Sequence, residues 1–368
     1  MFYKRLKHIK ETLKKEKLDA VFLSNASNIT YLSGYSNFSK DEREAYIFLG
    51  PDFGYIITDG RYSEAIKKEV PHLKLFERGG GKSTEELFKK HKSKIKSLGI
   101  EEDNLTVSEH KVIKKHFKNI KHIGFSNLRS IKDKEEVEKI KKACEIGDLA
   151  FKYILKKLKV GVSEKEIAQI LKRFIEGNNA EISFPAIVAF GKNSSVPHHQ
   201  TGKTILGPES SSGREGLIIL LDFGVKWENY CSDMTRTVFF GEPSSKQKEI
   251  YNIVLEAQKK AIDYINSQIK LGKKIKTEDA DKTARDYIIK KGYPSIPHSL
   301  GHGIGLEVHE QPYISIKSKE ELKKGMVFSI EPGIYIENFG GVRIEDLYIL
   351  GKDRLEQITN SSKELVII

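Results

Sequence analysis

The chain has 368 residues, which exceeds one average domain, so we expect two domains. Its 38% of hydrophobic and 31% of charged residues are typical of a water-soluble globular protein and exclude a largely disordered one. The net charge of +12 comes mainly from lysines dispersed along predicted helices, without the basic and aromatic tracts of a nucleic-acid-binding surface. No apolar run approaches the roughly 20 residues of a membrane-spanning helix. We therefore expect neither nucleic acid nor a membrane as a partner.

Cysteine content and the first residues indicate the cellular compartment. The sequence holds two cysteines, Cys144 and Cys231, which are too few for a disulfide framework or a thiolate zinc site. The first residues, MFYKRLKHIK, lead into a lysine-rich amphipathic stretch and not into the apolar core of a secretion signal. A reducing, cytoplasmic location is therefore expected.

The first part of the chain alternates predicted helices and strands. Apolar spacing predicts a helix over residues 5–18, and the short apolar run that follows predicts a buried strand over residues 20–23. The further predicted elements are strands over residues 45–49 and 55–58 and helices over residues 62–69, 83–98 and 107–117. Such alternation predicts an α/β domain with a mixed sheet, which we place over residues 1–126.

A break near residues 126–133 separates this domain from a second one over residues 127–368. A long helical pattern begins at Glu135, and Ser163-Glu164-Lys165-Glu166 is a capping box that starts another helix. The further predicted elements are helices over residues 245–269 and 278–291 and strands over residues 217–222, 233–240, 326–331 and 341–350. This order predicts an α+β domain with an antiparallel sheet covered on one side.

Two aspartates lie on neighbouring predicted strands of the second domain. Asp222 ends an apolar strand, and Asp233 shares one face of the next strand with Thr235 and Thr237, because side chains alternate along a strand. The two carboxylates could meet across a hairpin. Taken alone, a strand-end aspartate is more often a turn or cap residue.

A histidine cluster follows in HSLGHGIGLEVHE, which carries His298, His302 and His309 among glycines. Glycine permits tight backbone turns and the close approach of other groups. A single histidine in such a loop is more often structural or solvated than a ligand. Three histidines within twelve residues weaken that interpretation considerably.

Two glutamates complete the set of candidate ligands. Glu331 ends another apolar strand and precedes Pro332, which cannot extend a strand ladder. In GGVRIEDL, Arg343 and Glu345 share one face of a predicted strand. Taken alone, this glutamate and arginine could simply form a buried ion pair.

Together, these motifs present four carboxylates and one imidazole from strand ends or glycine-rich turns of one predicted domain: Asp222, Asp233, His302, Glu331 and Glu345. Repulsion between four buried carboxylates is prohibitive without cations. Two divalent metal ions about 3.5–4 Å apart, as in two-metal hydrolases, would neutralise it. A ligand set rich in oxygen, with one nitrogen and no sulfur, favours Mn or Co, with Fe or Zn as alternatives.

The chain resembles the pita-bread metallopeptidases, which comprise methionine aminopeptidase, aminopeptidase P, prolidase and the related creatinase. The resemblance rests on motifs that occur in the family's order: LDFG, YCSDMTRT, HSLGHGIGLEVHE, SIEPGIYI and GGVRIEDL. Upstream, NASNITYLSGY and TDGRYSEA resemble the creatinase/prolidase-type N-terminal domain. The resemblance covers nearly the whole chain and implies a pita-bread catalytic domain over residues 127–368.

The resemblance also implies roles for the five candidate ligands. Asp222 is expected to bind one metal ion, His302 and Glu331 the other, and Asp233 and Glu345 are expected to bridge the two. Glu331 is in addition the expected acceptor of the proton of the water that attacks the scissile carbonyl.

Other residues match positions around the metal site in the family. His198 and His309 match two active-site histidines that contact the substrate or stabilise the tetrahedral intermediate. Arg343 resembles an arginine that supports a bridging carboxylate. His199 has no such counterpart, and no role is predicted for it.

The resemblance implies a peptidase that cleaves Xaa-Pro dipeptides or the N-terminal Xaa-Pro bond of short peptides, since members with this N-terminal domain are typically Xaa-Pro specialists. Proline has no N–H and fixes φ near about −65°, so peptidases that grip an extended backbone handle it poorly. In some dipeptidase members an arginine follows the HE-x-P segment, whereas Tyr313 follows it here, which leaves room for longer peptides. A homodimer is also implied.

Two other functions remain open. One is a creatinase-like amidinohydrolase, which has the same fold but works without metal ions. The other is a catalytically silent binding module of this fold. Both predict that no stoichiometric metal is bound, so metal analysis distinguishes them from a peptidase.

Overall fold

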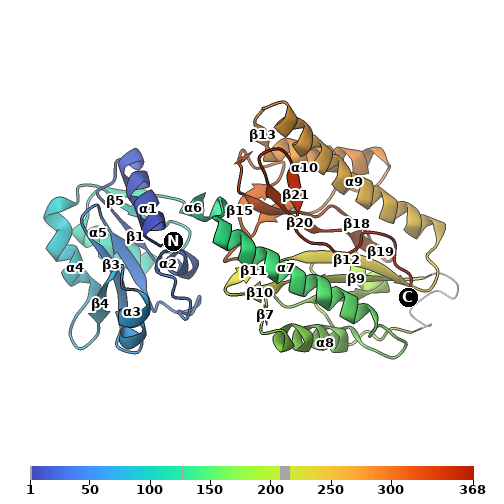
Figure 1. Cartoon of the computed structure of the whole chain (residues 1–368), viewed down its shortest axis with the longest axis horizontal. Coiled ribbons are helices and arrows are strands. Elements are labelled where there is room, and N and C mark those ends of the chain that lie inside the picture. Colours follow the sequence, from blue (N-terminus) through green and yellow to red (C-terminus); the bar gives the residue numbers. More distant parts are fainter. Residues whose placement is uncertain (1, 126, 208–215) are drawn as a thin grey trace. The chain divides into compact units, whose positions relative to one another are not determined.

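The computed structural model describes residues 2–125, 127–207 and 216–368 (Figure 1). The chain divides into two compact units, Met1–Arg129 and Ser130–Ile368.

The first unit is built on a mixed sheet of six strands in the order β4-β3-β2-β1-β5-β6. The strands are β1 (Ala20–Leu23), β2 (Tyr46–Leu49), β3 (Gly54–Asp59), β4 (Lys74–Arg78), β5 (Leu98–Ile100) and β6 (Ile120–His122). β2 pairs antiparallel with β1 and β3, and the other neighbours are parallel. The helices are α1 (Phe2–Glu16), α2 (Ala26–Ser33), α3 (Ser63–Glu69), α4 (Thr84–His91) and α5 (Val107–His116), and α6 (Asn127–Ser130) contains the division between the units. The α/β domain with a mixed sheet is therefore confirmed.

A buried aromatic cluster holds this sheet to its helices. The ring centroids of Phe22 on β1 and Phe48 on β2 lie 5.4 and 5.5 Å from that of Phe88 on α4, all in edge-on contact. The helix predicted over residues 83–98 is wrong in its second half, because α4 ends at His91 and β5 begins at Leu98. β5 is only three residues long and fully buried, and so short an apolar run carries no periodicity that separates strand from helix.

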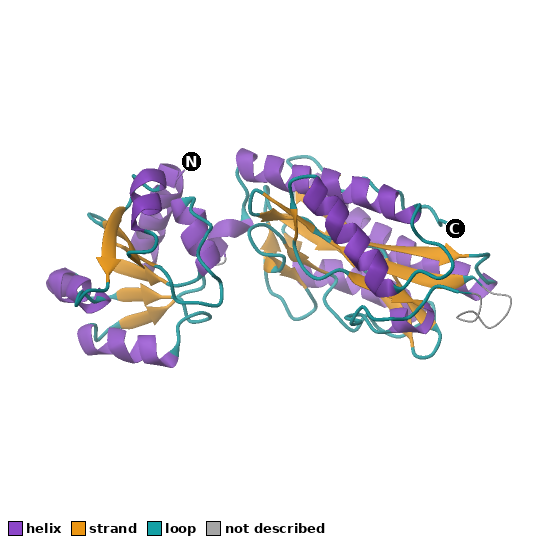
Figure 2. Ribbon diagram, turned by 90° about the horizontal axis from the view of Figure 1, so that it is seen from below, coloured by secondary structure: helices purple, strands orange, loops and turns teal. Residues whose placement is uncertain are grey.

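The second unit combines four main helices with several small antiparallel sheets. The helices are α7 (Lys134–Leu155), α8 (Glu164–Gly177), α9 (Ser245–Lys270) and α10 (Thr277–Lys290). The strands that matter for the site are β8 (Ile187–Phe190), β9 (Leu217–Phe223), β12 (Met234–Phe240), β14 (Gly301–Gly303), β15 (Glu310–Ile314), β17 (Val327–Ile330), β18 (Gly333–Ile336), β19 (Gly340–Arg343), β20 (Asp346–Leu350) and β21 (Leu355–Gln357). They form sheets ordered β12-β9-β8, β15-β14-β17-β20-β21 and β18-β19. The α+β architecture is confirmed, and Figure 2 shows the long helices running alongside the strands.

Two apolar cores fix these sheets. In one, α7 and α8 pack on β8, β9 and β12 through residues such as Phe151, Leu171 and Phe223. In the other, α9 and α10 pack on the sheet that contains β17 and β20 through residues such as Val254 and Phe328. The strand ends between the two cores are therefore held by packing on both sides.

The strand predicted over residues 341–350 is wrong as a continuous element. β19 pairs with β18, whereas β20 pairs with β17 and β21, so the chain changes sheets between them. At this crossing the amide of Ile344 donates to Pro332 O and the amide of Glu345 donates to Thr235 O. The alternating apolar pattern fits either arrangement, and only these tertiary hydrogen bonds distinguish them. The crossing presents Glu345 at a corner between sheets.

No helix in the described part of the chain has the length and apolar character needed to cross a membrane.

The helix α9 begins with a capping box. Ser244 accepts a hydrogen bond from the amide of Gln247, and the Gln247 side chain accepts one from the amide of Ser244.

Candidate metal centre

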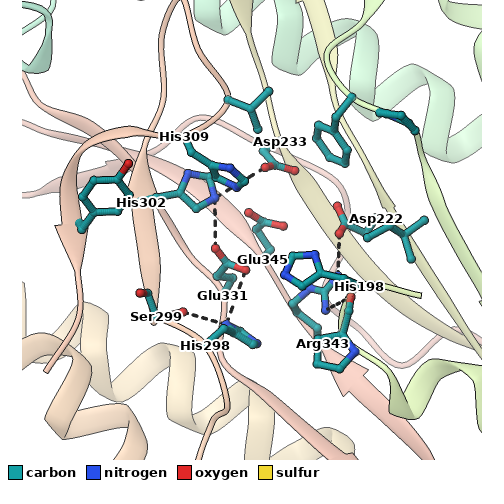
Figure 3. Close-up of a pocket in the computed structure, with 16 residues that line it drawn as sticks. His198, Asp222, Asp233, His298, Ser299, His302, His309, Glu331, Arg343 and Glu345 are labelled. Carbon is teal, nitrogen blue, oxygen red and sulfur yellow. Dashed lines mark hydrogen bonds and ion pairs between the residues drawn. The ribbon is translucent and has the colours of Figure 1, made fainter. Parts of the chain in front are cut away.

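Side chains from the ends of several strands meet in one cavity of about 550 Å³ in the second unit. Asp222 lies near the end of β9, Asp233 directly before β12, and His302 in β14. Glu331 directly follows β17, and Glu345 lies between β19 and β20. Figure 3 shows the five side chains directed toward a common space. The pairing of β9 with β12 sets Thr235 opposite Asp222, which brings the two aspartates to the same end of this hairpin.

The five side chains form two overlapping groups, and a third group combines Asp233 and His302 with His309. One ligand atom from each of Asp222, Asp233 and Glu345 lies within 4.8 Å of the others, and the same holds for His302, Glu331 and Glu345. His302 Nε2 lies 3.2 Å from Glu331 Oε1 and 3.7 Å from Asp233 Oδ2. Glu345 therefore belongs to both groups and lies between them.

Three carboxylate oxygens in this cluster have no hydrogen-bond donor among the residues that the structure describes. Asp222 Oδ1, Asp233 Oδ1 and Glu345 Oε1 are buried and accept no hydrogen bond from any residue that the structure describes. A buried carboxylate oxygen without a donor or cation is costly, since its hydration is lost without replacement. The donor set and these open oxygens fit divalent metal ions.

The pKa values of the carboxylates are shifted in opposite directions. Burial, together with the charge of Glu345, raises the pKa of Asp233 well above its usual range, and burial and the charge of Glu331 do the same for Glu345. Burial also acts to raise the pKa of Glu331, but the hydrogen bond and charge of His302 outweigh it and lower this pKa to about 2. Without cations, the protein can hold only part of the cluster ionised.

Arg343 is a buried cation that contacts the cluster. Its Nη2 donates to Asp222 Oδ2 at 2.6 Å, and its Nε donates to Thr235 Oγ1 at 3.0 Å. Thr235 Oγ1 in turn donates to Glu345 Oε2 at 2.7 Å. Arg343 thus contacts Asp222 directly and reaches Glu345, one of the two carboxylates expected to bridge, through Thr235.

The two histidines predicted at the site, His198 and His309, line the same cavity, whereas His199, next to His198 in the sequence, does not. His198 and His309 both lie in its wall, and the His309 ring packs edge-on against His302 with 4.2 Å between centroids. Burial and the neighbouring His302 lower the pKa of His309. His199 instead lies against Glu164, with Nε2 2.9 Å from Oε2.

Sequence reasoning gave no role to two further residues at the site. His298 lines the cavity, 4.0 Å from Glu331 Oε2, and its Nε2 lies 2.9 Å from the hydroxyl of Tyr335. The same hydroxyl accepts from Arg343 Nη1 at 2.7 Å. The four-residue spacing of His298 and His302 was the available signal, whereas Tyr335 could be found only from the pairing of β18 with β19.

The rest of the cavity wall is largely apolar. Its apolar and aromatic residues are Phe184, Pro185, Ile187, Pro197, Val308 and Tyr313. No sequence pattern singled them out as a group, because they come from loops and strands far apart in the chain. Such a wall suits a compact apolar substrate group beside the polar cluster.

Fold and site together are those of a metallopeptidase, in which carboxylates and an imidazole of the kind that bind divalent metal ions line one cavity. The chain belongs to metallopeptidase family M24, which residues 138–352 match. Residues 5–131 match the Creatinase/Prolidase N-terminal domain. The resemblance drawn from the motifs is thereby confirmed.

Relatives of known name span the whole chain. An Xaa-Pro dipeptidase from Pyrococcus horikoshii is 36% identical over 371 residues, which cover 98% of each chain. A solved Xaa-Pro dipeptidase from Bacillus anthracis is 35% identical, with a TM-score of 0.88 and 100% of both chains covered. A solved X-Pro aminopeptidase from Thermotoga maritima is 34% identical, with a TM-score of 0.80 over 96% of this chain and 98% of the other.

Proposed function

We propose that this protein is a dinuclear metal-dependent peptidase that hydrolyses the Xaa-Pro bond of dipeptides and of the N-termini of short peptides. The observation that carries the proposal is the pair of ligand groups that share Glu345 in one cavity. Relatives named as an Xaa-Pro dipeptidase and an X-Pro aminopeptidase support the choice of substrate.

The family resemblance supplies the proposed division of the ligands between two metal ions. Asp222 would hold one ion, His302 and Glu331 the other, and Asp233 and Glu345 would be shared. The open oxygens of Asp222, Asp233 and Glu345 support metal binding by these residues, because each is buried and accepts no hydrogen bond from the described residues. A shared Asp233 is supported by its place in one group with Asp222 and in another with His302. When bound, the ions, with Mn or Co favoured by the oxygen-rich ligands, would activate a water and polarise the scissile carbonyl.

The protein side chains supply the remaining steps. Glu331 lies beside His302 in the cavity and would accept the proton of the attacking water. His309 has a lowered pKa, so it is neutral near pH 7 and can donate one N–H to the tetrahedral oxygen. His198 lies in the same cavity wall and would contact the substrate on its other side.

Substrate length is the finer part of the proposal. Tyr313, which follows the HE-x-P segment, lines the cavity where some dipeptidases carry an arginine. An arginine would pair with the terminal carboxylate of a dipeptide, whereas a tyrosine also accommodates a continuing chain. We therefore propose that Xaa-Pro-Yaa peptides are substrates beside the dipeptides.

The experiment compares the two substrate lengths on metal-defined enzyme. The purified protein is stripped by a chelator, reloaded with Mn or Co, and assayed on Xaa-Pro dipeptides and Xaa-Pro-Yaa tripeptides, with Asp233→Ala as control. Metal-dependent cleavage of both, lost in the variant, is expected. Cleavage of dipeptides alone would restrict the enzyme to prolidase activity. The absence of metal-dependent cleavage of either would overturn the proposal, and a lack of bound metal would point to a creatinase-like enzyme or a silent module.

We further propose that the protein is a cytoplasmic homodimer. The sequence holds only two cysteines, Cys144 and Cys231, and so low a cysteine content suits a reducing compartment. Size-exclusion chromatography with light scattering measures the mass directly, and a monomer at micromolar concentration would contradict the dimer.

A further inference from the structure

His199, beside the cavity histidine His198, contacts a fully buried carboxylate. Its Nε2 lies 2.9 Å from Glu164 Oε2, and Glu164 is 0% exposed. Buried glutamates are rare unless charge or hydrogen bonds compensate them. Glu164 therefore requires hydrogen-bond partners that compensate for its lost hydration.

Glu164 accepts hydrogen bonds from both ends of the segment that carries His198. Its Oε1 accepts from the Phe190 amide and from Asn193 Nδ2, each at 2.8 Å. Its Oε2 accepts from the Gly202 amide at 2.9 Å, beside the contact with His199. One carboxylate thus closes the chain from residue 190 to residue 202 into a loop.

The carboxylate is held on a rigid element. Glu164 is the first residue of α8, whose apolar face, including Ile167 and Leu171, is buried in the core beneath β8 and β9. The amide of Glu164 also donates to Thr204 O at 3.0 Å, which fixes the start of the helix against the end of the loop. Helix capping does not explain Glu164, because the capping box pairs Ser163 with Glu166.

The opposite side of the loop rests on the metal centre. Pro197 O accepts from Arg343 Nη1 at 3.4 Å, and Ser194 Oγ accepts from the Gly341 amide at 2.8 Å. His198 follows Pro197 directly, and Figure 3 shows it beside Arg343 and Asp222. The loop therefore lies between Glu164 on one side and the strand of Arg343 on the other.

We infer that Glu164, together with His199, is a positioning residue that holds His198 toward the substrate. The inference rests on the proposed function, in which His198 contacts the substrate. A carboxylate can accept from all four donors at once, whereas an amide at the same place would turn its own N–H groups toward two of them. His199 supplies one of the four donors, which gives a role to the histidine for which the sequence predicted none.

The test combines Glu164→Gln with His198→Ala in a double-mutant cycle. Glu164→Gln is expected to lower kcat on Xaa-Pro dipeptides by roughly 10-fold to 100-fold, as small displacements of catalytic groups do, while the metal content stays that of the wild type. In the His198→Ala background the same change is expected to have little further effect, because the group it positions is gone. Glu166→Gln, two residues along the same helix and able to keep the capping box, is the matched control and is expected to retain wild-type kcat.

A second pair of variants covers the case in which Glu164→Gln does not fold. His199→Ala is expected to lower kcat several-fold, and His199→Gln to restore it, since the glutamine amide can still donate to Glu164. Equal losses in the wild-type and His198→Ala backgrounds, or equal activity of the two His199 variants, would overturn the inference.

Hydrogen exchange separates this inference from the proposed function. The amides of Phe190 and Gly202 are expected to exchange faster in Glu164→Gln than in the wild type, whatever the substrate is. Unchanged exchange at both amides would overturn the positioning role. A wild-type protein that cleaves no Xaa-Pro peptide would overturn the proposed function while leaving this measurement valid.

Discussion

Thr235 donates a hydrogen bond of 2.7 Å to Glu345 Oε2, which fixes the carboxylate common to both ligand groups. Thr235 is 0% exposed and accepts from Arg343 Nε at 3.0 Å, so it relays the position of the guanidinium to Glu345. Thr235→Val keeps the shape but removes the hydroxyl. We expect the affinity for Mn to fall by about 10-fold, as for other groups that orient metal ligands. Calorimetric titration of the metal-free protein with Mn measures this affinity. Thr235→Ser keeps the hydroxyl and should restore it. Equal Mn affinities of the valine and serine variants would show that the hydroxyl does not orient Glu345.

Asp233→Ala removes a carboxylate expected to be shared by both metal ions. We expect kcat/KM to fall by on the order of 10³-fold, which corresponds to several kcal/mol of lost transition-state stabilisation. The rise in melting temperature on adding Mn should also disappear, because bound metal stabilises only a protein that binds it in the folded state. Thermal unfolding with and without Mn, beside metal analysis, tests both statements. A variant that still gains stability from Mn would show that Asp233 is not a ligand.

Removing the metal ions should make stability depend on pH in a defined direction. The pKa values of Asp233 and Glu345 are raised by burial and neighbouring carboxylates, and that of His302 is raised overall by Glu331 although burial lowers it. Groups with raised folded-state pKa values stabilise at low pH and lose that contribution as pH rises. The pKa of Glu331 is lowered to about 2, so this group stabilises the folded state at high pH. Its contribution to stability no longer changes above about pH 5. The chelated protein should therefore melt at lower temperature at about pH 8 than at about pH 5.

Differential scanning fluorimetry in excess chelator measures this pH dependence. The metal-loaded protein is the control, and its melting temperature should change less over the same range because cations replace protons in the cluster. A melting temperature of the chelated protein that rises with pH over this range would contradict the assigned shifts.

Tyr335→Phe removes the hydroxyl that joins Arg343 to His298. The hydroxyl accepts from Arg343 Nη1 at 2.7 Å and lies 2.9 Å from His298 Nε2. We expect kcat to fall by about 10-fold with unchanged metal content, because the change loosens two side chains at the cavity without removing a ligand. Steady-state kinetics on an Xaa-Pro dipeptide, beside metal analysis, test this. Full activity of the variant would exclude a function for the hydroxyl.

Gly301→Ala tests the close approach of two strands at the centre. A Cβ at this position in β14 would overlap the backbone oxygen of Ser329 on β17, which cannot move without separating the sheet. We expect the free energy of unfolding to fall by roughly 3 kcal/mol. Gly177→Ala, at the end of α8 with no atom within 4 Å of the added Cβ, is the control and should stay within about 0.5 kcal/mol of the wild type. Urea unfolding of both variants measures their free energies of unfolding. Equal values for the two variants would contradict the predicted overlap at Gly301.

Local signals predicted much of the fold. The strand β1 lies where the apolar run predicted it, and the Ser163 capping box starts α8 as expected, because both depend on neighbours in sequence. The two wrong elements, the helix over residues 83–98 and the strand over residues 341–350, end where tertiary pairing overrides the local pattern. Periodicity carries no information on which sheet a strand joins.

The candidate site likewise contains residues that the sequence could predict and residues that it could not. Motif order was enough to select Asp222, Glu331 and the other ligand candidates, and the structure brings all five into one cavity. The contact of Arg343 with Asp222 and the place of Tyr335 depend on how β18 and β19 lie against β9, which no spacing in the sequence encodes. The apolar residues of the cavity wall could not be predicted for the same reason, since they share only their position in the folded protein.

The crossing of the chain between β19 and β20 has a consequence for how the protein would acquire the proposed metal ions. Glu345, which joins the two ligand groups, reaches the cavity only when both sheets have formed and met. A short zinc-binding motif gathers its ligands from neighbouring residues and can capture metal while the chain is still folding. Here the candidate ligands lie on separate strands far apart in sequence, so a partly folded chain offers only scattered, hydrated carboxylates. In the proposed two-metal peptidase, the full set of candidate ligands would exist only after these sheets have met, so the metal ions would bind to an already folded chain.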